Sequence, residues 1–291
     1  MKTIIVTGTS TGIGFAAAVA LARAGHDVIG TMRDPARSPE LQARAAKETL
    51  SITTVALDVD SDASVSRGMA KIQEMRGRVD VLVNNAGIGQ LGSVEEMPLD
   101  QFRQVMETNF FGALRCIQAV LPGMRTRKSG CIINVTSVAG KLASAGQSAY
   151  CASKFALEAL SESLAAEMRP FNVRVAIVEP GVIQTPIFGK AADVSRAIYQ
   201  GPRRLNAILD AALEQPVPAS VVGEQIRDIV ADESWQLRYP SGPAAAGILA
   251  WRASMTDEDF VAIGALGDDA WCEYMQNNLG LNVRPHLLSV S

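Results

Sequence analysis

Tyr150 and Lys154 lie four residues apart at the start of a predicted helix. Because four residues make about one helical turn, both side chains should share one face of that helix. A phenol has an ordinary pKa of about 10 and is a poor base at neutral pH, but a neighbouring ammonium group favours its anion. The pair could therefore exchange a proton with a substrate hydroxyl. The same spacing is common by chance, so a half-buried tyrosine beside a surface lysine is the alternative interpretation.

Two further polar segments follow predicted strands. Ser137 comes after the strand predicted over residues 131–135, and Asn-Asn-Ala-Gly at residues 84–87 follows another. The carboxyl ends of parallel strands meet at one edge of a sheet, so these segments should converge there with Tyr150. The small residues at 84–87 would let a flat ligand lie against the backbone. Ser137 could instead cap the following turn, which is the commoner role for a serine in that place.

Residues 7–14 form a glycine-rich loop, Thr-Gly-Thr-Ser-Thr-Gly-Ile-Gly, between the first predicted strand and the first predicted helix. A phosphate-bearing ligand requires glycines at such a turn, because the backbone must approach closely and the helix must offer free N–H groups. The spacing is G-x-x-x-G-x-G rather than G-x-G-x-x-G, and glycines are common at strand-to-helix turns for purely structural reasons. The position at the first βα turn favours ligand binding.

The end of the second predicted strand indicates which dinucleotide would bind. An acidic side chain there would pair with the ribose 2′-hydroxyl, whereas an arginine accommodates a 2′-phosphate. Here Met32 stands where an acid is expected, and Arg33 follows it. NADP(H) is therefore favoured over NAD(H). The alternative is that Arg33 is a solvated residue at the strand end and that Asp34 turns inward.

Short apolar runs alternate with longer amphipathic ones over the first two-thirds of the chain. This alternation predicts an α/β fold, a doubly wound Rossmann-type parallel sheet with helices on both faces. The predicted strands span residues 3–7, 27–32, 53–57, 79–83, 131–135 and 174–179, with a further strand at 236–239. The predicted helices span residues 13–24, 40–47, 64–75, 99–124, 149–168 and 220–231, with weaker helical segments from 241 onward, including 256–265.

The pattern loosens after Pro180, which predicts a single domain with a C-terminal extension. Residues 1–188 are expected to form the dinucleotide-binding catalytic Rossmann domain, and residues 189–291 the substrate lid and C-terminal extension of the same domain. Residues 183–201 have no clear period and are interpreted as a lid flanked by Gly181, Gly189 and Gly201. An ordinary surface loop is an equally good interpretation of that segment.

The composition narrows the classes of function. The chain has 291 residues, of which 48% are hydrophobic and 5% aromatic, and its formal net charge is −3. The near-neutral charge and the low aromatic content argue against nucleic acid as the main ligand. The sequence predicts no membrane-spanning helix. Four widely spaced cysteines are typical of reduced thiols in a cytoplasmic protein, and with only two histidines no metal site is expected.

These motifs together resemble those of the classical short-chain dehydrogenase/reductase family. The resemblance rests on the loop at residues 7–14, Asn-Asn-Ala-Gly at 84–87, Ser137 with Tyr150 and Lys154, and the Pro180-Gly181 turn, all in family order. It covers residues 1 to about 188 and fades beyond them. Residues 150–158 and 31–34 are similar to the NADP-preferring hydroxysteroid and retinol dehydrogenase-like branch, which also carries a long C-terminal extension.

The resemblance implies roles for four residues. Tyr150 matches the general acid/base, Lys154 the residue that lowers the Tyr150 pKa and binds the nicotinamide ribose, and Ser137 the residue that hydrogen-bonds the substrate oxygen. Asn109 matches the asparagine that carries a water-linked proton relay with the lysine. From its own surroundings in the sequence, Asn109 would be interpreted as a core polar residue that kinks a helix.

The resemblance also implies a cofactor site. Asp58 matches a residue near the adenine, and Val182 and Thr185 match the segment that touches the nicotinamide carboxamide. The implied cofactor-binding residues are Gly8, Ser10, Thr11, Gly12, Ile13, Gly14, Arg33, Asp58, Val59, Asn85, Ala86, Gly87, Tyr150, Lys154, Pro180, Gly181, Val182 and Thr185.

The expected function is therefore an NADP(H)-dependent oxidoreductase that interconverts a secondary alcohol and a ketone, or a primary alcohol and an aldehyde, on an apolar substrate. One alternative is a non-catalytic dinucleotide-binding sensor, and another is an NAD-dependent epimerase or dehydratase on the same fold. The glycine spacing and the shorter chain argue against the epimerase, and the presence of Asn109, Ser137, Tyr150 and Lys154 argues against the sensor. By the same resemblance, the protein is expected to form a homodimer or homotetramer.

Overall fold

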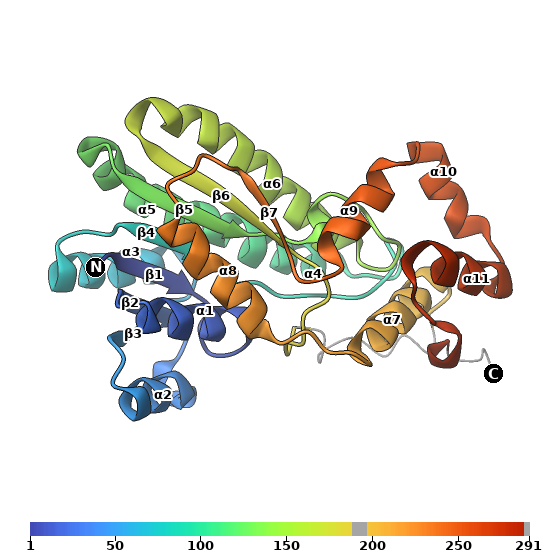
Figure 1. Cartoon of the computed structure of the whole chain (residues 1–291), viewed down its shortest axis with the longest axis horizontal. Helices are drawn as coiled ribbons and strands as arrows, with labels where there is room; N and C mark the ends of the chain where they lie inside the picture. Colours follow the sequence, from blue (N-terminus) through green and yellow to red (C-terminus); the bar gives the residue numbers. More distant parts are fainter. Residues whose placement is uncertain (188–196, 288–291) are drawn as a thin grey trace.

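A computed structural model describes residues 1–187 and 197–287 of the chain. Within those residues, the strands form one parallel sheet of seven strands in the order β3-β2-β1-β4-β5-β6-β7. Helices cover both faces of the sheet (Figure 1). This confirms the predicted doubly wound Rossmann-type fold. The strand order reverses at β1: β2 and β3 follow on one side of β1, and β4 to β7 follow on the other. Ligands of such sheets bind at the carboxyl ends of the strands at this point.

The strands begin and end close to their predicted positions. Residues such as Ile4, Ile5, Leu82 and Ile132 are fully buried, as expected for strands covered on both faces. The largest change is in the last strand, which lies two residues later than predicted. The bounds are β1 Thr3–Thr7, β2 Asp27–Met32, β3 Ile52–Ala56, β4 Val81–Asn84, β5 Gly130–Val135, β6 Val173–Pro180 and β7 Arg238–Ser241.

Two hydrophobic clusters separate the helices by face. On one face α1 (Gly12–Arg23) packs against α8 (Ala219–Ala231), with α2 (Glu40–Glu48) at the edge. On the other face the sheet is covered by α3 (Asp62–Arg76), α5 (Gly112–Arg127) and α6 (Ser148–Met168). The sheet is therefore buried on both sides, and polar side chains of the strands are left to gather at its ends.

The single helix predicted over residues 99–124 is interrupted. It consists of α4 (Leu99–Met106), one π-helical turn at Glu107–Phe111, and α5. A π turn inserts one extra residue into the helix without changing its apolar pattern enough to be detected from the sequence. Such turns are frequent at functional sites, and this one carries Asn109.

The C-terminal part of the chain contributes to the sheet and also builds a separate layer. Strand β7 lies beside β6. Helices α7 (Gln200–Leu213), α9 (Ala245–Ala253), α10 (Asp257–Ala262) and α11 (Asp268–Leu279) gather beyond the carboxyl ends of the strands (Figure 1). Trp271 and Cys272 of α11 pack there against Ala207 of α7. This layer stands over the end of the sheet where the predicted site residues lie.

The segment predicted as a lid is described only at its two ends. Residues 188–196, with Gly189, lie outside the described residues. Before them, Gln184 pairs with Pro218 in an isolated bridge. After them, Gly201, which was expected to flank the lid, is the second residue of α7. No helix in residues 1–187 or 197–287 is both long and apolar enough to cross a membrane.

Candidate active site

A cleft of about 350 Å³ opens at the carboxyl edge of the sheet. Segments that follow β1 to β6 line it, together with the start of α6. Most of the residues singled out from the sequence lie in this lining, and Gly14, Asn109 and Val182 do not. Those in the lining are Gly8, Ser10, Thr11, Gly12, Ile13, Arg33, Asp58, Val59, Asn85, Ala86, Gly87, Ser137, Tyr150, Lys154, Pro180, Gly181 and Thr185.

The glycine-rich loop has a backbone that only glycine accommodates well. Gly8 and Gly12 have φ values of 70° and 61°. A Cβ atom on Gly14 would lie 2.3 Å from the carbonyl oxygen of Gly8, so this glycine supports the loop from beneath. No side chain caps α1, since the Thr11 side chain makes no such hydrogen bond. The first N–H groups of α1 thus face the cleft at the positive end of the helix dipole, a suitable cradle for the phosphates of a dinucleotide.

The Asn-Asn-Ala-Gly segment fixes this loop in place. The backbone N–H groups of Asn85 and Ala86 both donate to the Thr7 hydroxyl, each at 3.0 Å. The side-chain amide of Asn85 donates back to the carbonyl oxygens of Thr7 and Gly8, at 2.9 and 3.2 Å. The segment after β4 is therefore hydrogen-bonded to the end of β1, and both lie flat against the same cleft.

Arg33, Asp58 and Asp60 line the part of the cleft formed by the segments after β2 and β3. Arg33 is exposed at the rim, directly after the buried Met32. Asp34 does not turn into the cleft; its carboxylate caps the next turn by accepting from the Ala36 N–H at 3.0 Å. Burial raises the pKa of Asp60, while the Thr108 hydroxyl and the charge of Arg33 act in the opposite direction. The rim thus presents one guanidinium beside acidic groups.

Ser137 has two hydrogen-bonding roles. Its Oγ caps the following turn by accepting from the Ala139 N–H at 3.1 Å, which was the alternative interpretation of this serine. The hydroxyl also donates to the carbonyl oxygen of Pro180 at 3.3 Å and shares a hydrogen bond with Tyr150. Because it touches Tyr150 from the next segment of the cleft wall, Ser137 is fixed at the point where a substrate oxygen would meet the phenol.

Tyr150 and Lys154 lie together, almost completely buried, with the lysine Nζ 5.6 Å from the centre of the phenol ring. Burial raises the pKa of Tyr150 to about 12, and the hydrogen bond to Ser137 acts in the opposite direction. Burial also lowers the pKa of Lys154 to about 8, against the charge of Glu158. Desolvation is thus the largest influence on both groups, which leaves the phenol protonated and the lysine close to its titration point at neutral pH.

Asn109 lies behind the cleft wall. Its side chain accepts from the Ile88 N–H at 2.8 Å and donates to the Ile88 carbonyl oxygen at 3.0 Å. The same amide nitrogen donates to the Ser153 hydroxyl at 2.9 Å. The π turn directs this side chain inward, where it ties the segment after β4 to the helix that carries Tyr150 and Lys154.

The segment after β6 places a different residue in the cleft from the one expected. Ile183 and Thr185 line the cleft, whereas Val182 packs beside Leu91 and Leu205. Adjacent side chains point in different directions after the Pro180-Gly181 turn, so Val182 lies outside the cleft lining and its contact with the cofactor stays a prediction. Two further apolar residues were not predicted: Ile88 lines the cleft, and Ile187 packs against the cluster that contains Tyr150. An apolar residue has no chemical signature that would have identified it.

Comparisons with known proteins agree with this geometry. The family model described as short chain dehydrogenase matches residues 2–195. Human retinol dehydrogenase 8 is 42% identical over 241 residues, which cover 79% of this chain and 75% of the human protein.

Solved structures show the same fold. A short-chain dehydrogenase from Streptomyces avermitilis has a TM-score of 0.79 and 36% identity, and the match covers 91% of this chain and 98% of that one. An alcohol dehydrogenase from Thermococcus sibiricus, complexed with 5-hydroxy-NADP, has a TM-score of 0.70 and 25% identity over 82% of this chain and 95% of the other. The similarity extends well into the C-terminal part of the chain.

Proposed function

The chain belongs to the short chain dehydrogenase family, and from this premise we propose that it is an NADP(H)-dependent oxidoreductase. The proposed reaction interconverts a secondary alcohol and a ketone, or a primary alcohol and an aldehyde. One observation carries the proposal: Ser137, Tyr150 and Lys154 meet in the same cleft as an uncapped, glycine-lined helix N-terminus. A protein that only binds the dinucleotide as a sensor would not require these three side chains.

Different residues would bind the cofactor, hold the substrate and donate the proton in this reaction. The glycine loop and the N-terminus of α1 would hold the cofactor phosphates, and Lys154 the nicotinamide ribose. When bound, the cofactor supplies or accepts the hydride. Ser137 would hold the substrate oxygen beside the phenol of Tyr150. Because burial keeps that phenol protonated, Tyr150 is suited to donate its proton to the oxygen of a carbonyl as the carbonyl is reduced.

The preference for NADP(H) is proposed on the basis of Arg33. This residue stands at the rim after β2, and the acidic side chain that would bind a 2′-hydroxyl is replaced by Met32. The Thermococcus relative with a bound NADP analogue supports the same choice. A charge-assisted hydrogen bond contributes about 1.5–3 kcal/mol, which corresponds to about a 10- to 150-fold preference.

An apolar substrate is proposed because the wall beside Tyr150 is apolar. Ile187 packs against the cluster formed by Tyr150, Ala139 and Cys151, and Ile88 lines the opposite segment. Human retinol dehydrogenase 8, named for an apolar alcohol, is among the relatives. We also propose self-association, since Phe111 and Phe155 are large apolar residues, each 42% exposed, on the helices that flank the site. A cytoplasmic location is proposed from the four cysteines, none of which is in a disulfide.

The test combines binding with turnover. NADPH and NADH binding would be measured by fluorescence titration, and NADPH consumption across ketones and aldehydes from small and polar to bulky and apolar. We expect tighter binding of NADPH and turnover that improves with apolar size. Failure to bind either dinucleotide would refute the proposal. Binding without turnover of any carbonyl, in either direction, would favour the sensor.

The cofactor preference has a separate test. Arg33→Ala should weaken NADPH binding by about 10- to 150-fold and leave NADH binding nearly unchanged. Arg37→Ala, which removes a nearby arginine that does not line the cleft, serves as the control. Equal losses for both dinucleotides would contradict the role of Arg33.

A further inference from the structure

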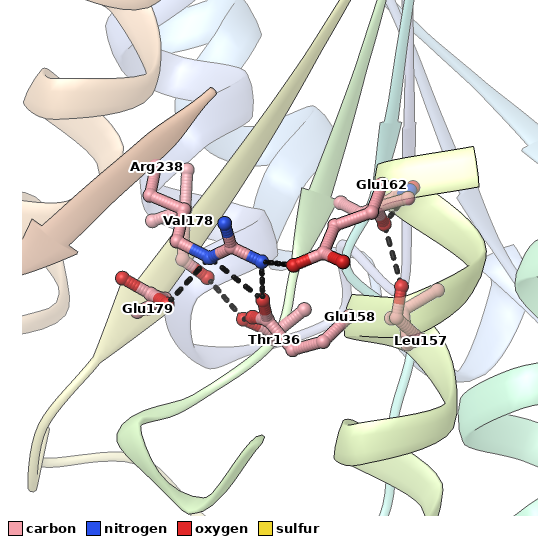
Figure 2. Close-up of polar contacts among 9 residues, drawn as sticks. Thr136, Leu157, Glu158, Glu162, Val178, Glu179 and Arg238 are labelled. Atoms are coloured by element: carbon pink, nitrogen blue, oxygen red, sulfur yellow. Dashed lines mark hydrogen bonds and ion pairs between the residues drawn. The ribbon is translucent and has the colours of Figure 1, made fainter. Parts of the chain in front are cut away.

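A partly buried group of charges lies behind the active site and includes a residue from the C-terminal part of the chain. Arg238 of β7 donates to Glu158 of α6 through Nε and Nη2, both at 3.1 Å. The same guanidinium is hydrogen-bonded to Glu162 and lies 3.4 Å from Glu179 Oε1 (Figure 2). Thus one arginine meets three carboxylates from two different elements.

This group is joined to the active site through consecutive residues. Lys154 and Glu158 are one turn apart on α6. Lys154 Nζ donates to the Val135 carbonyl oxygen at 2.9 Å, and the next residue, Thr136, donates its hydroxyl to Glu158 at 2.7 Å. Ser137 follows immediately. The two α6 side chains therefore clamp the end of β5 just before the serine that touches Tyr150.

The group has more negative than positive charge close to Arg238. Glu158 and Glu179 are almost completely buried, at 4% and 1% exposure, and Glu162 is exposed. The other cations whose charges act on these carboxylates are Lys154, from α6, and Lys141, after β5. Burial and the charge of Glu158 raise the pKa of Glu179 to about 7. The charge that Glu158 presents to Lys154 is therefore set by how well Arg238 compensates it.

We propose that Arg238 and Glu158 are positioning residues of the active site, through which the C-terminal part of the chain sets the charge around Lys154 and the position of Ser137. Arg238 neutralises part of the Glu158 carboxylate, and Glu158 in turn stabilises the ammonium form of Lys154. This inference rests on the proposed function only for its kinetic consequence. The charge linkage itself is a property of the protein alone.

The linkage predicts that replacing Glu158 and replacing Arg238 shift the Lys154 pKa, and with it the basic limb of the kcat/KM profile, in opposite directions. Glu158→Gln removes the carboxylate that stabilises the Lys154 ammonium, so the basic limb of the kcat/KM profile should move to lower pH by about 1 pH unit. Arg238→Gln leaves the full charge of Glu158 facing Lys154, so the basic limb should move to higher pH. Arg238→Lys keeps the charge and should restore the wild-type position. A merely structural role would lower activity without opposite shifts.

Two matched controls come from the same elements of the chain. Glu167→Gln removes an exposed carboxylate further along α6, outside the group around Arg238, and Arg284→Gln breaks an exposed pair with Asp269 elsewhere in the C-terminal part. Neither should move the basic limb. If both test variants moved it in the same direction, or not at all, in an enzyme that turns over, the inference would be overturned.

A second measurement does not depend on turnover. The thermal unfolding of the cofactor-free protein would be followed between pH 5 and pH 8. The Tm deficit of Arg238→Gln should grow with pH, because the buried Glu179 carboxyl, whose pKa is raised to about 7, loses its proton without a counter-charge. A deficit independent of pH would overturn the charge linkage. An inactive wild-type protein with a pH-dependent deficit would refute the proposed function and leave the linkage supported.

Discussion

Replacing Tyr150 with phenylalanine would remove one oxygen atom from the cleft and leave the buried ring in place. The phenol is 8% exposed and shares its hydrogen bond with Ser137, so its loss should cost only about 1 kcal/mol of unfolding free energy. The catalytic cost should be far larger. With a pKa raised to about 12, the phenol is protonated in essentially every molecule at neutral pH, so the whole population of enzyme loses its proton donor.

Proton donation by a positioned acid contributes about 10²- to 10⁴-fold in rate. At about 1.4 kcal/mol for each factor of ten, Tyr150→Phe should raise the barrier by about 3–5.5 kcal/mol. The phenol oxygen isn't needed for the phosphate cradle at Gly8–Gly14, so NADPH affinity should change by less than about threefold. The assay is single-turnover NADPH oxidation with a saturating carbonyl substrate, with cofactor affinity measured separately by fluorescence titration.

Tyr239→Phe provides the matched control. Tyr239 of β7 is 9% exposed, so the change removes an equally buried phenol oxygen, but from a residue that does not line the cleft. It should retain turnover within about threefold of the wild type. If Tyr150→Phe kept more than about a tenth of wild-type turnover, or if both variants lost activity equally, the assignment of Tyr150 as the proton donor would be refuted.

Three further predictions concern residues that support the active site from outside the cleft lining. Gly14→Ala should weaken NADPH binding at least about tenfold in fluorescence titration, because its Cβ would meet a backbone carbonyl at 2.3 Å; Gly247→Ala, in open space, should not. Asn109→Ala leaves the Ile88 N–H and carbonyl without their partner and should cost about 2–4 kcal/mol in urea unfolding, and a cost below about 1 kcal/mol would contradict this. Glu179 has a folded-state pKa raised to about 7, so the stability it contributes below about pH 4.5 is lost as pH rises through about 7. The Tm of Glu179→Gln relative to wild type should therefore rise between pH 5 and 8, and a constant difference would count against it.

The C-terminal part of the chain has a double role in this fold. It supplies β7 to the sheet and helices α7 and α9–α11 to the layer beyond the strand ends. Strand β7 brings the side chain of Arg238 into contact with the helix that carries Tyr150 and Lys154. The extension therefore contacts the active-site helix from the edge of the sheet, and its other helices lie beyond the carboxyl ends of the strands (Figure 1).

The sequence by itself determined the sheet, most of its strand bounds, and the convergence of Ser137, Tyr150 and Lys154 on one edge. These features depend on local signals. Strands buried on both faces have a continuous apolar pattern, a helix fixes the four-residue spacing, and parallel strands bring their carboxyl ends to one side of the sheet. The glycine loop was equally local, because the sharp turn between β1 and α1 restricts residue type directly.

The tertiary structure decided what depends on packing between distant segments. The resemblance implied that Lys154 lowers the pKa of Tyr150, but burial raises the pKa of Tyr150 and lowers that of Lys154, and no local pattern reports burial at that depth. The π turn that carries Asn109 inward depends on one extra residue in the helix, and the position of Ile183 in the cleft depends on the path of the chain after β6. The contact of Arg238 with Glu158 joins residues 80 positions apart. Such contacts arise only when β7 is placed beside β6, because the chemistry of an arginine in the sequence does not specify which carboxylate the fold will bring to it.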